Sequence, residues 1–552
     1  MFRKRDPQGS LFHANLLVPP AKAERLQASW AEIFRQRALP LIREELFAPL
    51  YCPNNGRPNR PVQTVFGVLL LKDMFNLTDQ EALDELEFSL LWHHALELTP
   101  EEAHLPQKTL HNFRAALMEH QLERLAFAEI TDRILGELGT KVGRQRLDST
   151  HVISHIAVLT RLGLFCETTR VFLAQLKADH PRLWERVPVR LRARYLQEDG
   201  QASGYHDARS QDGHRRLAVC GRDVYRLWEL FRGTAAAHGS GYGLLERLLA
   251  EQCRVGRRKQ RPCRDDDDRG EGAVPVVLKA PKEVSGASLQ SPHDPDVTYS
   301  GRKGKGYAVQ VAETCDEDNA VEIITHVEVT DACASDTQAT LPTLAALAQR
   351  GQQPQELVAD TAYGSGDNAV EAQRWGTGLV SPVSGSATAP QSAAQPAPTM
   401  ADFVVDVRGE DPAICPAGHL SLSQVSDPQR PQQVTVGFER RACESCRLVG
   451  RCAVRLEAAQ DAYVLRIDLV AANLVQRRRA EASGAFAARY AIRAGSEATN
   501  SELKRRHGLG HLRVRGRPRV VLAVHLKALA CNLKRLVRAL LAPACPALPT
   551  TG

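Results

Sequence analysis

Hydrophobic and polar positions in the first quarter of the chain repeat with the period of an α-helix. Apolar residues dominate 61–75, which predicts a buried helix. Thr78 and Glu81 form a capping-box pattern that predicts the start of the next helix, and 109–130 is predicted as a longer one. The pattern therefore predicts an N-terminal helical domain over 1–135. Such a domain either binds DNA or is a plain helical bundle, and the sequence leaves both open.

Further along the chain, runs rich in β-branched residues alternate with helical patterns. Strand and helix patterns follow one another at 306–314, 320–329, 338–349, 356–360 and 367–375. This alternation predicts an α/β sheet. At the C-terminal end, apolar residues in 520–541 recur at helical spacing, which predicts an amphipathic helix packed on the sheet with its Lys and Arg residues facing solvent.

One predicted helix, 484–508, carries an unusual stripe of polar side chains. Tyr490, Arg493, Glu497 and Lys504 fall within an arc of roughly 60° at 100° per residue. One carboxylate with two cations and a phenol is typical of a site for metal and phosphate. A solvated face with helical ion pairs is the alternative. Glu481 and Glu502 point well away from the stripe, which leaves Glu497 as the candidate acid. The expected role of Glu502 is that of a surface charge.

Two aspartates upstream lie where an α/β sheet places its ligands. Asp148 is inside a short β-like run, and Asp360 ends the apolar run of 357–359 before a Gly-rich turn. Each aspartate alone is more often a cap or turn residue, and Asp360 followed by Thr also fits a helix entry. Together with Glu497 they make a candidate set of three catalytic carboxylates.

The three acids and their surroundings resemble one family. Tyr-x2-Arg-x3-Glu-x6-Lys, read from Tyr490, resembles the YREK signature of bacterial insertion-sequence DDE transposases. LDSTHV around Asp148 and ADTAYGSGDN around Asp360 resemble their first and second aspartate strands. The segments 51–61 and 291–310 resemble other parts of the same proteins, in the same order.

This resemblance implies a fold and a chemistry. The fold is an α/β ribonuclease H-like catalytic core, in which Asp148, Asp360 and Glu497 bind two Mg²⁺ (or Mn²⁺) ions for DNA cleavage and strand transfer. The side chains expected to contact DNA are Tyr490, Arg493, Lys504, Arg505 and Arg506. The expected partner is double-stranded DNA, both transposon ends and target, bound by a homodimer on paired inverted repeats. The expected location is the bacterial cytoplasm, at the nucleoid.

Composition shifts divide the rest of the chain. The first part of the core is expected at 140–382, with a helical insertion at about 157–295. A Ser/Ala/Pro-rich linker and a cysteine-rich insertion follow at 383–475, and the core resumes at 476–552.

The cysteine-rich insertion has the spacing of a zinc knuckle. Its two halves are CPAGH and CESCRLVGRC, which supply Cys415, Cys443, Cys446 and Cys452. Four thiolates at short paired spacings favour a structural zinc ion, with His419 as a possible substitute for one thiolate. Reduced cysteines without metal are the alternative.

Charge and hydropathy narrow the function class. The net charge of +7 is modest, but basic clusters at 475–480, 503–508 and 511–521 lie near Glu497 in sequence and favour a polyanion track. No apolar run approaches the ~18 residues of a membrane span, and the first residues lack a signal peptide's apolar core. Thirteen cysteines then indicate a reducing compartment. A ribonuclease H-fold nuclease or resolvase without strand transfer, and a catalytically silent transposase-derived DNA-binding protein, stay open as alternatives.

Overall fold

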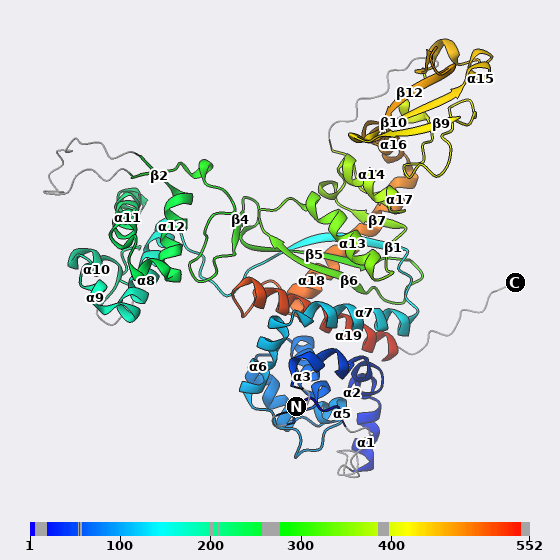
Figure 1. The fold of residues 1–552 in the computed structure, drawn as a ribbon. Helices are drawn as coiled ribbons and strands as arrows, with labels where there is room; N and C mark the ends of the chain where they lie inside the picture. Colours follow the sequence, from blue (N-terminus) through cyan, green and yellow to red (C-terminus); the bar gives the residue numbers. More distant parts are fainter. Residues whose placement is uncertain are drawn as a thin grey trace.

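A computed structural model describes residues 1–5, 19–52, 55, 58–197, 202–206, 210–256, 276–384 and 397–541 (Figure 1). The structure does not describe the acidic run of the sequence at 265–268, most of the basic segment 253–264, or most of the predicted Ser/Ala/Pro-rich linker. Among the described residues, no helix combines the length and the apolar character needed to cross a bilayer.

The N-terminal region is helical, as predicted. Its α-helices are α1 (Pro20–Gln27), α2 (Trp30–Ile33), α3 (Val62–Phe75), α4 (Asp79–Phe88), α5 (Leu90–Leu96), α6 (Gln107–Glu119) and α7 (Leu122–Leu138). Helix α3 is apolar on almost all sides and is buried along most of its length. The capping box is confirmed: the Glu81 N–H donates to Thr78 Oγ1 at 3.2 Å, and the Thr78 N–H donates to Glu81 Oε2 at 2.7 Å. The single helix expected over 109–130 is wrong, because Gln121 adopts a left-handed backbone conformation that separates α6 from α7.

A mixed sheet forms the centre of the molecule. Its strands are β1 (Arg144–Val152), β4 (Thr298–Ser300), β5 (Gly304–Thr314), β6 (Ile324–Asp331), β7 (Glu356–Ala359) and β8 (Gly378–Val380). The spatial order is β6-β5-β1-β7-β8, with β4 extending the edge of β5. Strands β1, β7 and β8 are parallel to one another, whereas β5 is antiparallel to both β1 and β6. This mixed order is consistent with the expected ribonuclease H-like core.

Helices cover both faces of the sheet. Helices α13 (Thr340–Gln349) and α14 (Gly366–Arg374) bury apolar residues of β1, β5 and β7 on one face. Helices α7 and α19 (Arg517–Leu541) cover the other face, seen below the sheet in Figure 1. Helix α19 also packs on α3, so that one continuous hydrophobic core joins the sheet to the N-terminal helices.

The C-terminal helix differs from its prediction in one respect. It packs on the sheet as expected, but two of its cations do not face solvent. Lys527 is buried and donates to Asp73 Oδ1 at 2.9 Å, and Arg535 is buried against Glu313 at 3.2 Å. A helix enclosed between two layers has little outer face left for its cations, so each one needs a carboxylate partner.

Two further bodies extend from the core (Figure 1). The first follows β1 and consists of α8 (Arg161–Asp179), α9 (Pro181–Trp184), α10 (Val189–Tyr195), α11 (Ser210–Phe231), α12 (Ser240–Gln252), β2 (Cys253–Val255) and β3 (Val276–Leu278). It has a hydrophobic core of its own. The second contains β9 (Ser423–Asp427), β10 (Arg430–Glu439), α15 (Arg440–Glu444), β11 (Arg455–Glu457) and β12 (Ala462–Asp468), again around a separate core. Helix α16 (Leu469–Glu481) leads back to the sheet, where it packs on α14.

Candidate active site

Two of the three predicted acids lie side by side on neighbouring strands. Asp148 is in β1, and Asp360 directly follows β7. The two strands are parallel, and Leu147 pairs with Ala359 at the last matched position. The next residue on each strand is therefore one of the two acids. Asp360 also caps a 3₁₀ turn, because its carboxylate accepts from the Thr361 N–H at 2.7 Å. The expectation that Asp360 can act as a cap residue is therefore confirmed.

The third acid comes to the same place on a helix. Glu497 lies in the first turn of α18 (Gly495–Arg506), which packs on β1. The Arg493 guanidinium contacts all three carboxylates: it is 3.6 Å from Asp148, 3.9 Å from Asp360 and 3.8 Å from Glu497. Three acids separated by more than a hundred residues in sequence thus surround one cation.

The three carboxylates differ in their exposure. The side chain of Asp148 is 14% exposed, that of Asp360 is 49% and that of Glu497 is 74%. Burial raises the pKa of Asp148 above its usual range, while the Ser149 N–H, Arg493 and the Ser496 hydroxyl act in the opposite direction. Asp148 is also fixed in orientation, because Ser496 Oγ donates to its Oδ2 at 3.0 Å and Asn500 Nδ2 donates to the same oxygen at 3.3 Å. The site therefore has one rigid acid and two accessible ones.

A buried ionic network holds α18 in place, and sequence reasoning missed it. Arg146 on β1 donates to Glu313 Oε1 at 2.8 Å and to the Ile492 carbonyl at 2.9 Å. Arg535 on α19 bridges Glu313 and Glu502, with its Nη2 at 3.0 Å from Glu502 Oε2. These contacts tie the chain on both sides of Glu497 to the sheet and to α19.

One sequence expectation changes because of this network. Glu502 does point away from the acids, but it is not a free surface charge, because Arg535 and Arg538 both pair with it. Gly495 also has a specific role, since a Cβ there would lie 2.0 Å from the Arg146 guanidinium. The glycine at the start of α18 was the available signal that another group passes close to the backbone.

The polar stripe is formed, although not by one continuous helix. Helix α17 (Gly484–Ala491) is followed by a 3₁₀ turn, Ile492–Ala494, before α18 begins. Tyr490 stacks on Phe486 with a centroid distance of 5.7 Å. Burial raises the pKa of Tyr490, Arg493 opposes that rise, and the charges of Asp360 and Asp148 add to it. Tyr490 therefore lies within electrostatic reach of the acids.

The basic end of α18 extends the site. Lys504, Arg505 and Arg506 are exposed. Burial of its stem lowers the pKa of Lys504, and a second lysine, Lys303, lowers it further. Lys303 was not predicted as a site residue; it donates to Ser149 Oγ at 3.2 Å, next to Asp148. Two lysines thus lie beside the buried acid.

The four predicted zinc ligands line one small cavity in the second body. Cys415, Cys443, Cys446 and Cys452 surround it together with His419. Backbone N–H groups point at two of the sulfurs, from His419 to Cys415 Sγ at 3.3 Å and from Leu448 to Cys446 Sγ at 3.4 Å. Burial raises the pKa of Cys443 to about 11, and the other three sulfurs add to the rise. A metal cation bound beside Cys443 would favour its thiolate form instead.

The spacing of these sulfurs is looser than that of a closed metal site. Among the described residues, one group of three or more His, Cys, Asp or Glu ligand atoms has all its members within 4.8 Å of one another. That group is Glu502, His507 and Cys531, and no three of the clustered cysteine sulfurs are that close. That trio does not fit a metal, because Arg535 and Arg538 already neutralise its carboxylate.

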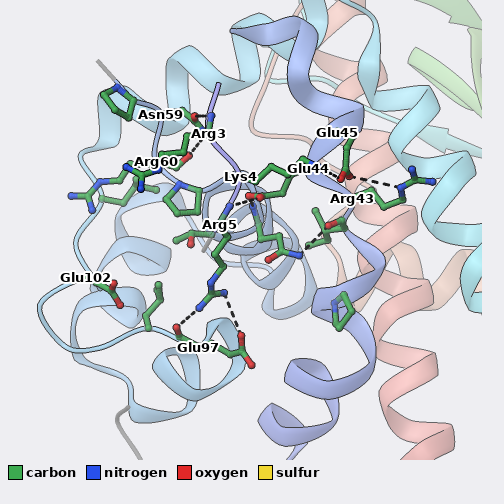
Figure 2. Close-up of a pocket in the computed structure, with 18 of the residues that line it drawn as sticks. Arg3, Lys4, Arg5, Arg43, Glu44, Glu45, Asn59, Arg60, Glu97 and Glu102 are labelled. Carbon is green, nitrogen blue, oxygen red and sulfur yellow. Dashed lines mark hydrogen bonds and ion pairs between the residues drawn. The ribbon is translucent and has the colours of Figure 1, made fainter. Parts of the chain in front are cut away.

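A large cavity of about 800 Å³ lies in the N-terminal region (Figure 2). Two of its cations are held by neighbouring groups. Arg5 donates to the Leu96 carbonyl at 2.9 Å, the Arg5 N–H donates to Glu44 at 2.6 Å, and Lys4 contacts Glu45 at 2.6 Å. These contacts fasten the first residues of the chain to the helices, and we assign the cavity no ligand.

Two segments of the chain match family models. Residues 414–537 match a family described as "Transposase DDE domain", and residues 29–116 match one described as "Transposase domain (DUF772)". The first match includes Glu497 and the cysteine cluster, whereas Asp148 and Asp360 precede it. Comparison with curated proteins and with solved structures gave no match.

Proposed function

We propose that this protein acts on the terminal inverted repeats of an insertion sequence. Its DDE domain makes it a transposase, which cleaves and transfers DNA strands with divalent metal ions. The resemblance of its motifs to bacterial YREK transposases supports the assignment of terminal inverted repeats as its substrate. So does the presence of a transposase domain at both ends of the chain. On this proposal the protein works as a homodimer on paired transposon ends, in the bacterial cytoplasm at the nucleoid.

The observation that carries the proposal is the convergence of Asp148, Asp360 and Glu497 around Arg493. Three carboxylates supply the oxygen ligands that Mg²⁺ or Mn²⁺ prefers, and the existing pairing with a cation shows that their charges need compensation. Two such ions would activate the attacking oxygen and stabilise the leaving oxygen of an in-line displacement at phosphorus. The donor set therefore fits the cofactor expected for this class of enzyme.

On this proposal, the residues beside the three acids contact the DNA strand. Arg493 and Lys504 hold phosphate oxygens beside the scissile bond, as charge-assisted donors do. Tyr490, at the rim of the acids, contacts the end of the strand. Arg505 and Arg506, exposed on the last turn of α18, extend the basic surface along the backbone.

Substitution of the acids tests the proposal. Asp148→Asn, Asp360→Asn and Glu497→Gln should each abolish cleavage and strand transfer and leave DNA binding intact, because phosphate contacts supply most of the affinity. The matched control is Asp367→Asn, an exposed aspartate seven residues after Asp360. A variant of the set that cleaves at the wild-type rate would remove that residue from the site. Cleavage without joining would favour the nuclease class instead.

The cysteine cluster is proposed to hold one structural zinc ion through Cys415, Cys443, Cys446 and Cys452. Two N–H groups directed at sulfur and the shared cavity support this assignment. Elemental analysis of protein purified without added metal should find one zinc per chain, and Cys446→Ser should lose it and destabilise 400–455. Cys333→Ser, at an exposed cysteine outside the cluster, is the control. Well-folded protein without zinc would refute the assignment.

A further inference from the structure

A groove of about 630 Å³ lies between the N-terminal helices and the segment that follows α18. Its walls come from α3, from the start of α4, from α6, from the strap 508–516 and from the first half of α19. We call it the strap groove. It joins two parts of the chain that are about 400 residues apart in sequence. The basic cluster at 511–521 was recognised in the sequence, but its pairing with the N-terminal helices was not.

The strap groove carries an excess of positive charge. Five cations line it, against two acids; the cations are Lys72, Arg114, Arg513, Arg519 and Lys527. Both acids are already engaged, because Asp73 pairs with Lys527 at 2.9 Å and Asp79 pairs with Arg114. The charge that remains is therefore cationic.

Two of the five cations, both arginines, are available to bind a ligand. Arg513 and Arg519 are exposed, and within the described part of the chain neither makes an ion pair at 4.0 Å or less. Arg513 donates to the Asn76 carbonyl at 3.4 Å. Its charge also reaches Glu81, which is already engaged in the capping box of α4. Two guanidinium groups without carboxylates in a concave surface favour a phosphate ligand.

The lining distinguishes a duplex from a single strand. Proteins that hold single-stranded DNA stack its bases on aromatic side chains. The residues that line the strap groove include no Phe, Tyr or Trp. This composition suits the sugar-phosphate backbone of a duplex, which needs cations and polar groups but no stacking surface.

The strap that walls the groove is paired with the chain directly after β1, the strand that carries Asp148. The Ile153 N–H donates to the Gly510 carbonyl at 3.0 Å, and the Leu512 N–H donates to the Ile153 carbonyl at 2.8 Å. The side chain of Lys504, in electrostatic reach of Asp148, packs against Gly510. Asp148 and Ile153 are five residue steps apart, a path of about 16 Å at ~3.3 Å per residue of extended chain.

We infer that the strap groove binds the phosphate backbone of the DNA duplex whose strand enters the active site. The contacts lie about five base pairs from the scissile phosphate, because 16 Å corresponds to roughly five steps of 3.4 Å along the axis of the duplex. The inference rests on the proposed function, since it takes the ligand to be DNA. It adds a binding surface that joins the N-terminal helices to the catalytic core.

The test is a salt series of binding to a 30-base-pair duplex of arbitrary sequence, in EDTA so that no cleavage occurs. The variant is the double substitution Arg513→Gln and Arg519→Gln. Loss of two phosphate contacts should lower the slope of log affinity against log salt by about 1.8. The control is Lys22→Gln with Arg25→Gln, two exposed cations on α1 at the far end of the N-terminal helices (Figure 1). Thermal melting of all proteins confirms that they are folded.

The outcomes distinguish a failure of the proposed function from a failure of the strap groove as the binding surface. If the wild-type protein fails to bind the duplex, the proposed function is wrong. If it binds and the groove variant keeps the wild-type slope, or if the control pair loses as much, the strap groove is not the binding surface. A lowered slope in the groove variant alone supports the inference. Ethylation of phosphates about five nucleotides from the cleavage position should then impair binding of the wild type and have no further effect on the variant.

Discussion

Replacement of Arg493 by glutamine should tighten metal binding while it impairs strand transfer. The guanidinium lies 3.6 to 3.9 Å from all three carboxylates, so it occupies the space where those acids would meet a metal ion. A unit charge about 4 Å from a divalent cation repels it by about 2 kcal/mol at the dielectric constant of water, which is roughly 30-fold in affinity. Rotation of the arginine away from the ion would relieve part of this repulsion. We therefore expect Arg493→Gln to bind Mn²⁺ about tenfold more tightly than the wild type.

Calorimetric titration with Mn²⁺ in the absence of DNA measures this effect without any catalytic turnover. The matched control is Arg489→Gln, because Arg489 lies one helical turn earlier and pairs with Glu356 instead of the three acids. Strand transfer, measured in parallel, should fall in Arg493→Gln because a phosphate contact is lost. Unchanged or weaker Mn²⁺ binding in this variant would refute the idea that the arginine stands in for the metal.

Two further predictions concern stability. Glu502→Ala should lower the free energy of unfolding by about 2 kcal/mol, because it leaves the buried Arg535 with one carboxylate fewer; thermal melting measures it, and a melting temperature equal to that of the wild type would contradict it. Hydrogen bonding from Arg35 lowers the pKa of Glu32 to about 2, below its value in the unfolded chain, so the stability contributed by Glu32 is complete above pH ~4.5 and is lost as the pH falls toward 2. Urea unfolding across this range should show a flatter pH dependence for Glu32→Gln, and identical profiles would contradict the assignment.

The positions of the acids followed from local sequence patterns. Asp360 ends an apolar run and precedes a glycine turn, and Asp148 lies in a β-like run, so each could be placed on a strand of an α/β sheet. The polar stripe of Glu497 followed from helical periodicity. These signals are local, because strand and helix periods are set by residues a few positions apart.

The buried residues that hold α18 against the sheet show no periodic pattern in the sequence. Arg146, Glu313 and Arg535 meet only because β1, β5 and α19 come together, and their separations in the chain exceed 160 residues. The 3₁₀ turn at 492–494 was also missed, since a turn of three residues changes the helical phase by only about 60°. The strap groove likewise depends on tertiary packing, because the basic cluster at 511–521 gives no sign that it faces the N-terminal helices.

The shared core of α3 and α19 has a consequence for biosynthesis. The apolar surface of α3 is synthesised long before α19, the helix that covers it. About 400 residues separate the end of α7 from the end of α19, which corresponds to roughly 20 to 80 seconds of translation at 5 to 20 residues per second. During that interval the N-terminal helices lack part of their core and the strap groove lacks one wall. A nascent chain therefore cannot assemble the proposed DNA-binding surface until α19 has been synthesised.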